Sequence, residues 1–230
     1  MSNSNQNEKL MKRSDVNQII KTSISFLNEM NFKIPNWSLW SKSDWKINSK
    51  LCDEIFSNGL GWDITDYGSG DFSKIGFVKF TIRNGKDKGY CEKIMIMEGT
   101  QVCPMHYHKN KVEDIINRGG SNLCFQLYHS DKDGNFTDEP LKIRFDGIER
   151  IIKPGEVFSI KPGESICITS FVYHSFWTEN LEGKVLIGEV SRVNDDSGDS
   201  IFKNPVSRFP ELNEDDEPTF LLVSDYKRIK

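Results

Sequence analysis

The chain has little that points to a membrane, a secretory route or a nucleic acid. No stretch of its 230 residues approaches the roughly 20 apolar residues of a membrane span, and the opening "MSNSNQNEKLMKR" lacks the apolar core of a signal peptide. The 30 Lys and Arg against 34 Asp and Glu give a net charge of −4, and the basic residues form no stripe that could follow a phosphate backbone. We therefore expect a cytoplasmic protein with neither a membrane nor a nucleic-acid partner.

Cysteine is also scarce. The five cysteines are an odd number at wide, irregular spacing, and no Cys-x-x-Cys pair is present. Most of them lie inside apolar runs, where a free thiol packs as a small hydrophobic side chain. The sequence therefore predicts buried, reduced thiols.

Helical spacing of apolar residues is confined to the N-terminal part of the chain. Residues 1–10 form a polar extension that we expect to be disordered, ahead of a single domain over residues 11–230. Within that domain the period of the apolar residues predicts a helix over about residues 14–31, with Ser14 as its N-cap, and more weakly a short helix at 52–57. The apolar positions of the first helix are Val16, Ile19, Ile20, Leu27 and Met30.

From about residue 75 to residue 193, short apolar runs alternate with turn signals, which is typical of β structure. We expect eight to ten strands there, with turns at Asn84-Gly85 and Asp146-Gly147. So many strands favour a closed barrel or a two-sheet jelly roll, because an open sheet would leave its edges unprotected. In the tail, the acidic run at 214–217 favours a solvated loop, and residues 220–223 resemble a strand.

Histidine is rare too, yet two of the four histidines stand in "PMHYHKNKVEDIINRGG" as a His-x-His pair. In a strand, His106 and His108 point to the same face, as two ligands of one ion must. A turn over residues 109–112 lets Glu113 open the next strand toward the same cavity, and His174 follows in another apolar segment that a barrel can bring close. Imidazole and carboxylate ligands suit Mn, Fe, Ni, Co or Zn. Exposed loop histidines, and a core histidine at 174, are the alternatives.

The segment "HYHKNKVE" together with His174 resembles the two metal-binding motifs of the cupin superfamily, although Thr169 and Phe171 stand where the second motif prefers Pro and Gly. Four longer segments, "GWDITDYG", "EKIMIMEGTQVCPMHYHKNKVEDIINRGG", "PGESICITSFVYHSFW" and "GEVSRVNDD", resemble the bacterial D-lyxose ketol-isomerase family. This resemblance implies a mainly β, cupin-type jelly-roll barrel with an N-terminal helical segment. It also implies a metal site formed by His106, His108, Glu113 and His174.

The same resemblance implies an enzyme that isomerises free sugars and depends on Mn²⁺, with other divalent transition metals as alternatives. Its reactions would interconvert D-lyxose with D-xylulose and D-mannose with D-fructose, and the protein would be a cytoplasmic homodimer. A metal-dependent cupin oxygenase, a phosphosugar isomerase and a non-enzymatic sugar-binding cupin remain alternatives.

Isomerisation needs a base, a proton donor and contacts to the sugar. Strand parity puts Glu189 on the face of Val185 and Ile187, which makes it the candidate base; a solvated acid at a strand end is the alternative. Lys93 is the candidate donor unless its face is outward. The remaining candidates are Asp196 for proton transfer and Trp62, Phe176 and Asp195 for substrate binding, with turn formation and core packing as their alternative roles.

Overall fold

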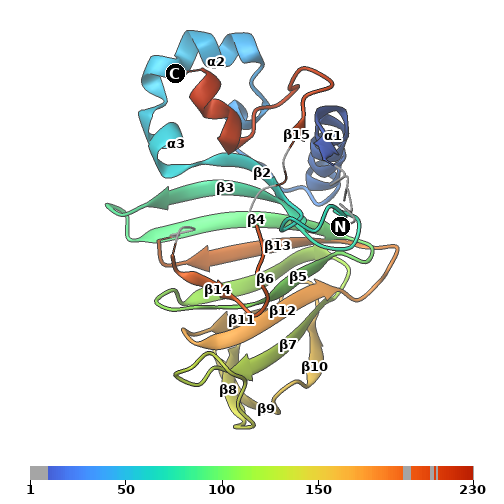
Figure 1. The fold of residues 1–230 in the computed structure, drawn as a ribbon, viewed down its shortest axis with the longest axis vertical. Coiled ribbons are helices and arrows are strands. Elements are labelled where there is room, and N and C mark those ends of the chain that lie inside the picture. Colours follow the sequence, from blue (N-terminus) through green and yellow to red (C-terminus); the bar gives the residue numbers. More distant parts are fainter. Residues whose placement is uncertain (1–9, 194–197, 208–209, 211, 230) are drawn as a thin grey trace, which may run out of the picture.

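The structure is a computed structural model that describes residues 10–193, 198–207, 210 and 212–229. Two antiparallel sheets face each other, and helices gather on the outside of the larger sheet and at one end of the molecule (Figure 1). The predicted mainly β, cupin-type jelly-roll barrel with an N-terminal helical segment is confirmed. No helix in the described part of the chain is long and apolar enough to cross a membrane.

The larger sheet has eight strands, and alternate residues of each strand face the second sheet. Their order is β2 (Gly61–Thr65), β3 (Phe77–Gly85), β4 (Tyr90–Glu98), β13 (Lys184–Ser191), β6 (Glu113–Gly120), β11 (Ser165–Ile168), β8 (Leu141–Phe145) and β9 (Ile148–Ile152). Strands far apart in the chain are neighbours here, because β13 pairs with both β4 and β6. Residues of β4, β6 and β13 therefore stand side by side on one wall of the barrel.

The smaller sheet forms the opposite wall. Its order is β10 (Val157–Ile160), β7 (Leu123–His129), β12 (Val172–Thr178), β5 (Val102–His108) and β14 (Ser200–Phe202). Apolar side chains of both sheets, such as Met97, Val185 and Phe125, pack into a shared core between the sheets. The continuous described stretch from 10 to 193 contains eleven strands between residues 77 and 191, slightly more than predicted.

Helix α1 (Arg13–Glu29) covers the outer face of the larger sheet, close to the predicted bounds of 14–31. Its apolar stripe, including Val16 and Ile20, packs against Trp62 and Phe80 of β2 and β3. Beyond the edge of that sheet lie five short elements: η1 (Asn36–Leu39), α2 (Lys42–Asn48), η2 (Ser49–Leu51), α3 (Asp53–Asn58) and η3 (Val223–Arg228) (Figure 1). Side chains from this region, including Trp45 and Tyr226, form a further, largely aromatic cluster.

The C-terminal tail contacts the N-terminal turn of α1, and these contacts correct one prediction. Ser14 is not the N-cap: it lies inside the helix, and its backbone N–H and hydroxyl both donate to the Asp215 carboxylate. Arg13 is fully buried and binds the carboxylates of Glu214 and Asp225. The acidic run at 214–217 is an exposed loop without regular secondary structure, as predicted, and it also supplies acceptors to the N-terminal turn of α1, where the helix dipole favours negative charge. A short parallel pair, β1 (Met11–Lys12) with β15 (Leu212–Asn213), adds to this junction.

The turns follow the sequence in part. Asp146 and Gly147 have φ of 50° and 84° and close the β8–β9 hairpin as predicted. Strand β3 continues through Gly85, so the predicted turn at Asn84-Gly85 lies two residues too early; the predicted strand at 220–223 is absent, and η3 begins there instead. Phe171, standing where the cupin motif prefers Gly, adopts a left-handed φ of 61°. All five cysteines are free, as predicted.

Candidate metal centre and active site

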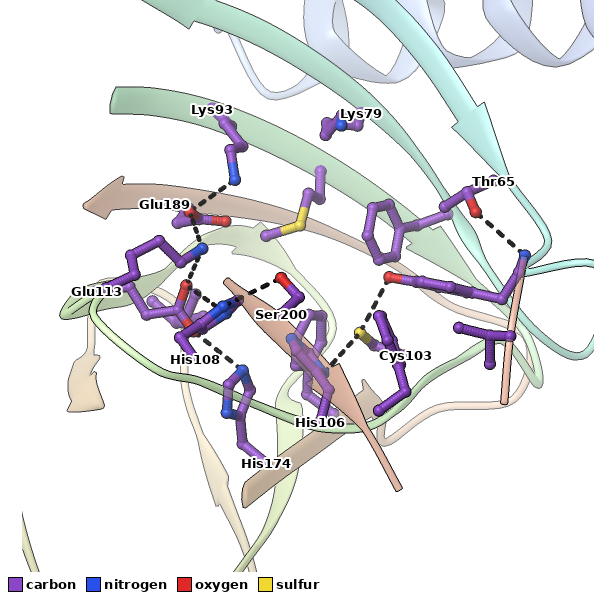
Figure 2. Close-up of a pocket in the computed structure, with 18 of the residues that line it drawn as sticks. Thr65, Lys79, Lys93, Cys103, His106, His108, Glu113, His174, Glu189 and Ser200 are labelled. Carbon is purple, nitrogen blue, oxygen red and sulfur yellow. Dashed lines mark hydrogen bonds and ion pairs between the residues drawn. The ribbon is translucent and has the colours of Figure 1, made fainter. Parts of the chain in front are cut away.

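A cavity of about 270 Å³ lies between the two sheets and borders the apolar core, since several core residues line it. The larger sheet and the turn at Lys111 supply its charged side chains, the smaller sheet supplies three histidines, and apolar side chains such as Met95, Ile115 and Phe176 also line it. Figure 2 shows the histidines on one side of this space and Lys93 and Lys79 on the other.

Three histidines gather in the smaller sheet. His106 and His108 come from alternate positions of β5, and His174 of β12 is the direct cross-strand partner of His106. One ring nitrogen of each lies within 4.8 Å of the others, so the three can hold a metal ion together. Burial lowers the pKa of His106 and of His108, which keeps these rings neutral at pH 7, as metal ligands must be.

Hydrogen bonds orient the imidazole rings. The Nδ1–H groups of His106 and His174 donate to the carbonyl oxygens of Pro104 and Val172 at 2.8 and 3.0 Å. Their Nε2 atoms therefore carry lone pairs that face the cavity, which is the tautomer that metal-binding histidines adopt. His108 Nδ1 lies 3.1 Å from the Ser200 hydroxyl of β14, so its ring is oriented as well.

Glu113, the first residue of β6, lies beside the histidines. Its Oε1 lies 2.9 Å from His174 Nε2, yet both atoms are buried and have no hydrogen-bond partner among the residues that the structure describes. Its Oε2 lies 3.5 Å from His108 Nε2. Two buried acceptors at this distance require a cation or a proton between them, so the site fits a metal ion with nitrogen and oxygen ligands.

Lys111 links the two buried carboxylates of the site. Its ammonium lies 2.6 Å from Glu113 and 2.9 Å from Glu189, and all three side chains are about 5 % exposed or less. Burial alone would lower the Lys111 pKa, but the two carboxylates raise it above its ordinary value. Sequence reasoning missed Lys111, because a lysine in the turn between two strands normally faces solvent.

Glu189 of β13 lies where strand parity placed it, and Lys93 of β4 is its direct cross-strand partner. Their ion pair is 2.8 Å long and buried (Figure 2). Burial raises the Glu189 pKa, but the charges of Lys111 and Lys93 outweigh burial and hold this pKa at about 2. Three donors converge on one oxygen, Oε1: Lys93, Lys111 and the Ser191 hydroxyl.

Trp62 does not reach the cavity, which corrects its assignment as a substrate-binding residue. Its side chain is on the outer face of β2, where it packs edge-on against Phe80 and donates from Nε1 to the Ser38 carbonyl. Because successive strand residues point to opposite faces, its neighbours Asp63 and Thr65 line the cavity instead.

Phe176 lines the cavity as expected. Asp195 and Asp196, predicted for substrate binding and proton transfer, lie outside the described residues. Asp199, which the sequence reasoning missed, is buried, and its carboxylate accepts from the backbone N–H groups of Asn110 and Lys111 at 2.7 and 3.2 Å. These hydrogen bonds hold the turn that carries Lys111 in place. Asp199 and Lys111 are 88 residues apart in the chain, so no local sequence pattern predicts this contact.

Comparison with known proteins adds independent information. A family model described as D-lyxose isomerase matches residues 11–226. A D-lyxose/D-mannose isomerase of Serratia proteamaculans is 41 % identical over 95 % of this chain and 99 % of the relative. One of Escherichia coli O157:H7 is 38 % identical over 96 % of this chain and 100 % of the relative.

Solved structures with similar folds are far more distant in sequence. The L-ribose isomerase of Cellulomonas parahominis, solved with L-ribose, has a TM-score of 0.54 at 11 % identity and covers 90 % of this chain and 98 % of its own. That of Geodermatophilus obscurus has a TM-score of 0.55 at 11 % identity, covering 89 % and 99 %. At this identity the likeness shows the fold alone.

Proposed function

The chain belongs to the D-lyxose isomerase family, and from this membership we propose that it interconverts D-lyxose with D-xylulose and D-mannose with D-fructose. It is accordingly an aldose–ketose isomerase, and its substrates are small free sugars. The observation that supports the chemistry is one buried cluster in the cavity, in which the three histidines lie beside Glu113, Glu189, Lys93 and Lys111.

His106, His108, His174 and Glu113 would hold a divalent ion, which we propose to be Mn²⁺. Such an ion polarises the sugar carbonyl and stabilises the negative charge that develops on the sugar oxygens. The orphaned pair formed by Glu113 Oε1 and His174 Nε2 supports this assignment, because a cation satisfies both atoms at once.

Glu189 is the proposed base. Because three donors occupy Oε1, the other oxygen, Oε2, is the atom that takes the proton from C2 of the aldose and returns it to C1 of the ketose. A pKa of about 2 makes Glu189 a weak base in the resting protein. When Lys93 turns its ammonium toward a sugar oxygen, Glu189 loses one of its cations and its pKa rises toward the working range.

Lys93 is the proposed donor to the sugar. Its ammonium lies beside the carboxylate that takes the carbon proton, so both groups reach the same pair of sugar carbons. By donating a hydrogen bond to the sugar oxygen that gains charge, Lys93 stabilises the enediolate, and the O2 hydroxyl proton passes to O1, so the ammonium ends with the proton it began with.

The test uses protein stripped with a chelator and reloaded with Mn²⁺, incubated with D-lyxose under nitrogen and assayed for D-xylulose. Ketose formation without oxygen is expected, and it also excludes an oxygenase. No ketose in the reloaded sample would refute the proposal. Glu189→Gln should abolish turnover with the metal content unchanged, whereas Glu98→Gln, which removes an acid paired with Lys184 near the surface, should retain activity. Full activity of Glu189→Gln would remove Glu189 as the base.

We further propose that the enzyme works as a homodimer in the cytoplasm. Light scattering of the eluted protein tests the first statement, with twice the chain mass of 26.5 kDa as the expected result and a monomer mass as the contradicting one. Fractionation of the cells that produce it tests the second.

A further inference from the structure

A second buried ion pair lines the cavity, and the proposed mechanism does not use it. Lys79 of β3 lies 3.1 Å from Asp63 of β2, and their side chains are 13 % and 6 % exposed. Both belong to the cavity wall that also carries Lys93 (Figure 2 labels Lys79 and Lys93). The pair therefore faces the space that a substrate would enter.

Strand geometry explains how a charged pair comes to face inward. Asp63 and Lys79 are direct cross-strand partners, and so are their neighbours Trp62 with Phe80 and Ile64 with Val78. The apolar pairs pack under α1 on the outer face, so the residues between them must point into the barrel.

Holding β2 to β3 does not require these charges. The strands are already joined by a ladder over five residue pairs and by apolar packing on the outer face. A buried ion pair is seldom more stable than apolar residues of the same size, because both charges lose their hydration. Charged side chains in a cavity wall are more typical of a binding site.

The position of the pair relative to the proposed base suits the far end of a sugar. Lys93 of β4 pairs with Thr81 of β3 on one side and with Glu189 of β13 on the other. Lys79 is two residues before Thr81 in β3, so Lys79 and Lys93 are diagonal neighbours whose Cα atoms are roughly 7–8 Å apart. Three or four C–C bonds of about 1.5 Å followed by one hydrogen bond of about 2.8 Å cover a similar span. A sugar whose C1 and C2 lie at Glu189 can thus bring its last hydroxyl to the pair.

We propose that Asp63 and Lys79 bind the terminal hydroxyl of the open-chain sugar and so determine which sugars are accepted. The chemistry is complementary, because a hydroxyl donates to a carboxylate and accepts from an ammonium at the same time. This inference rests on the proposed function. It assigns the pair to substrate selection, and the proton transfers at C1 and C2 proceed without it.

The experiment compares D-lyxose with 5-deoxy-D-lyxose, which lacks only the terminal hydroxyl, in Mn²⁺-loaded wild-type protein and in Lys79→Met. Wild type should prefer D-lyxose in kcat/KM by roughly 10- to 100-fold, because the deoxy sugar leaves a buried charged pair without its hydroxyl partner. Lys79→Met should lose most of that preference by raising KM for D-lyxose while the value for the deoxy sugar changes little. Arg83→Met, in the same strand but paired with Glu92 at the surface, should behave as wild type.

The outcomes separate the two proposals. Wild type that makes no ketose from D-lyxose removes the proposed function and this inference with it. Wild type that turns over both sugars equally, or a Lys79→Met protein that keeps the full preference, overturns the inference alone, since a purely structural pair would affect both sugars alike. If Lys79→Met does not fold, the neutral pair Asp63→Asn with Lys79→Gln carries the same comparison, with the same loss of preference expected and its retention as the overturning result.

Discussion

Replacing Lys111 by Gln removes a buried positive charge that contacts both Glu113 and Glu189. The substitution keeps a hydrogen-bond donor at similar length, so the lost quantity is mainly the positive charge. Glu113 loses a cation at 2.6 Å, and Glu189 loses one at 2.9 Å but retains Lys93 at 2.8 Å. The negative charges of Glu113 and Glu189 then repel each other without the positive charge of Lys111 between them.

The size of the effect follows from the burial of the group. Leaving a buried charge without its partner costs roughly 3–5 kcal/mol, and the retained Lys93 places Lys111→Gln near the lower figure. With a urea m-value of about 3 kcal/mol per M, the unfolding midpoint should fall by roughly 1 M. The assay is urea unfolding of chelator-treated protein at pH 7, because a bound divalent ion would supply the positive charge that the variant lacks.

The pH dependence gives a second readout of the same variant. In wild type the Glu189 pKa is lowered to about 2, so its stabilising contribution is complete above pH 4.5 and is lost as the pH falls toward 2. In Lys111→Gln this pKa is less depressed, so the stability difference between the proteins should be full at pH 7 and shrink below pH 4.5. Lys109→Gln, an exposed neighbour, should lie within about 0.5 kcal/mol of wild type. A Lys111→Gln protein as stable as Lys109→Gln at pH 7 would refute this reasoning.

Three further predictions concern the fold. Arg13→Leu should lower the free energy of unfolding by roughly 3 kcal/mol at pH 7, because it removes the buried guanidinium from the buried Asp225 and leaves this carboxylate with the exposed Arg228 at 3.8 Å; a calorimetric midpoint equal to that of wild type would contradict this. The hydrogen bond from Arg13 holds the pKa of Glu214 at about 2, so the thermal unfolding midpoint of wild type should decrease as the pH is lowered from 4.5 to 2. A thermal midpoint that stays constant over that range would contradict the stabilising role of this contact. Gly76→Ala should prevent stable folding, because Gly76 has a φ of 122° and a Cβ there would lie 1.9 Å from the Thr65 carbonyl oxygen; recovery of soluble protein with a native circular dichroism spectrum would show that the turn can move.

Local regularities of the sequence predicted much of the fold and the centre of the site. The period-2 rule alone put His106 and His108 on one face, and Glu189 with Val185 and Ile187 on another. The turn chemistry of Asp146-Gly147 predicted a hairpin that the structure contains. These predictions succeed because each depends on residues a few positions apart, whose relative directions the backbone geometry already determines.

Other features depended on contacts that the sequence does not encode locally. Residues Gly61 to Thr65 are all buried, so parity separates Trp62 from Asp63 but does not tell which of them faces the cavity. The packing of α1 decides this, because α1 covers the outer face of the sheet and contacts the apolar side chains there, including Trp62. The contact between the exposed acidic loop and the buried Arg13 likewise joins residues about 200 apart in the chain, which no local pattern predicts.

The sequence by itself therefore determined the barrel, the helix ahead of it and the candidate histidine ligands, because strand and helix periods are local properties of the chain. Only the tertiary structure decided that Lys111 joins Glu113 to Glu189, that Asp199 fixes the turn which carries Lys111, and that an ion pair from β2 and β3 faces the same cavity. Burial changes what these charged residues do. Removed from water, each must find a partner of opposite charge or a hydrogen bond, and those partners come from strands that are adjacent in the barrel and distant in the sequence.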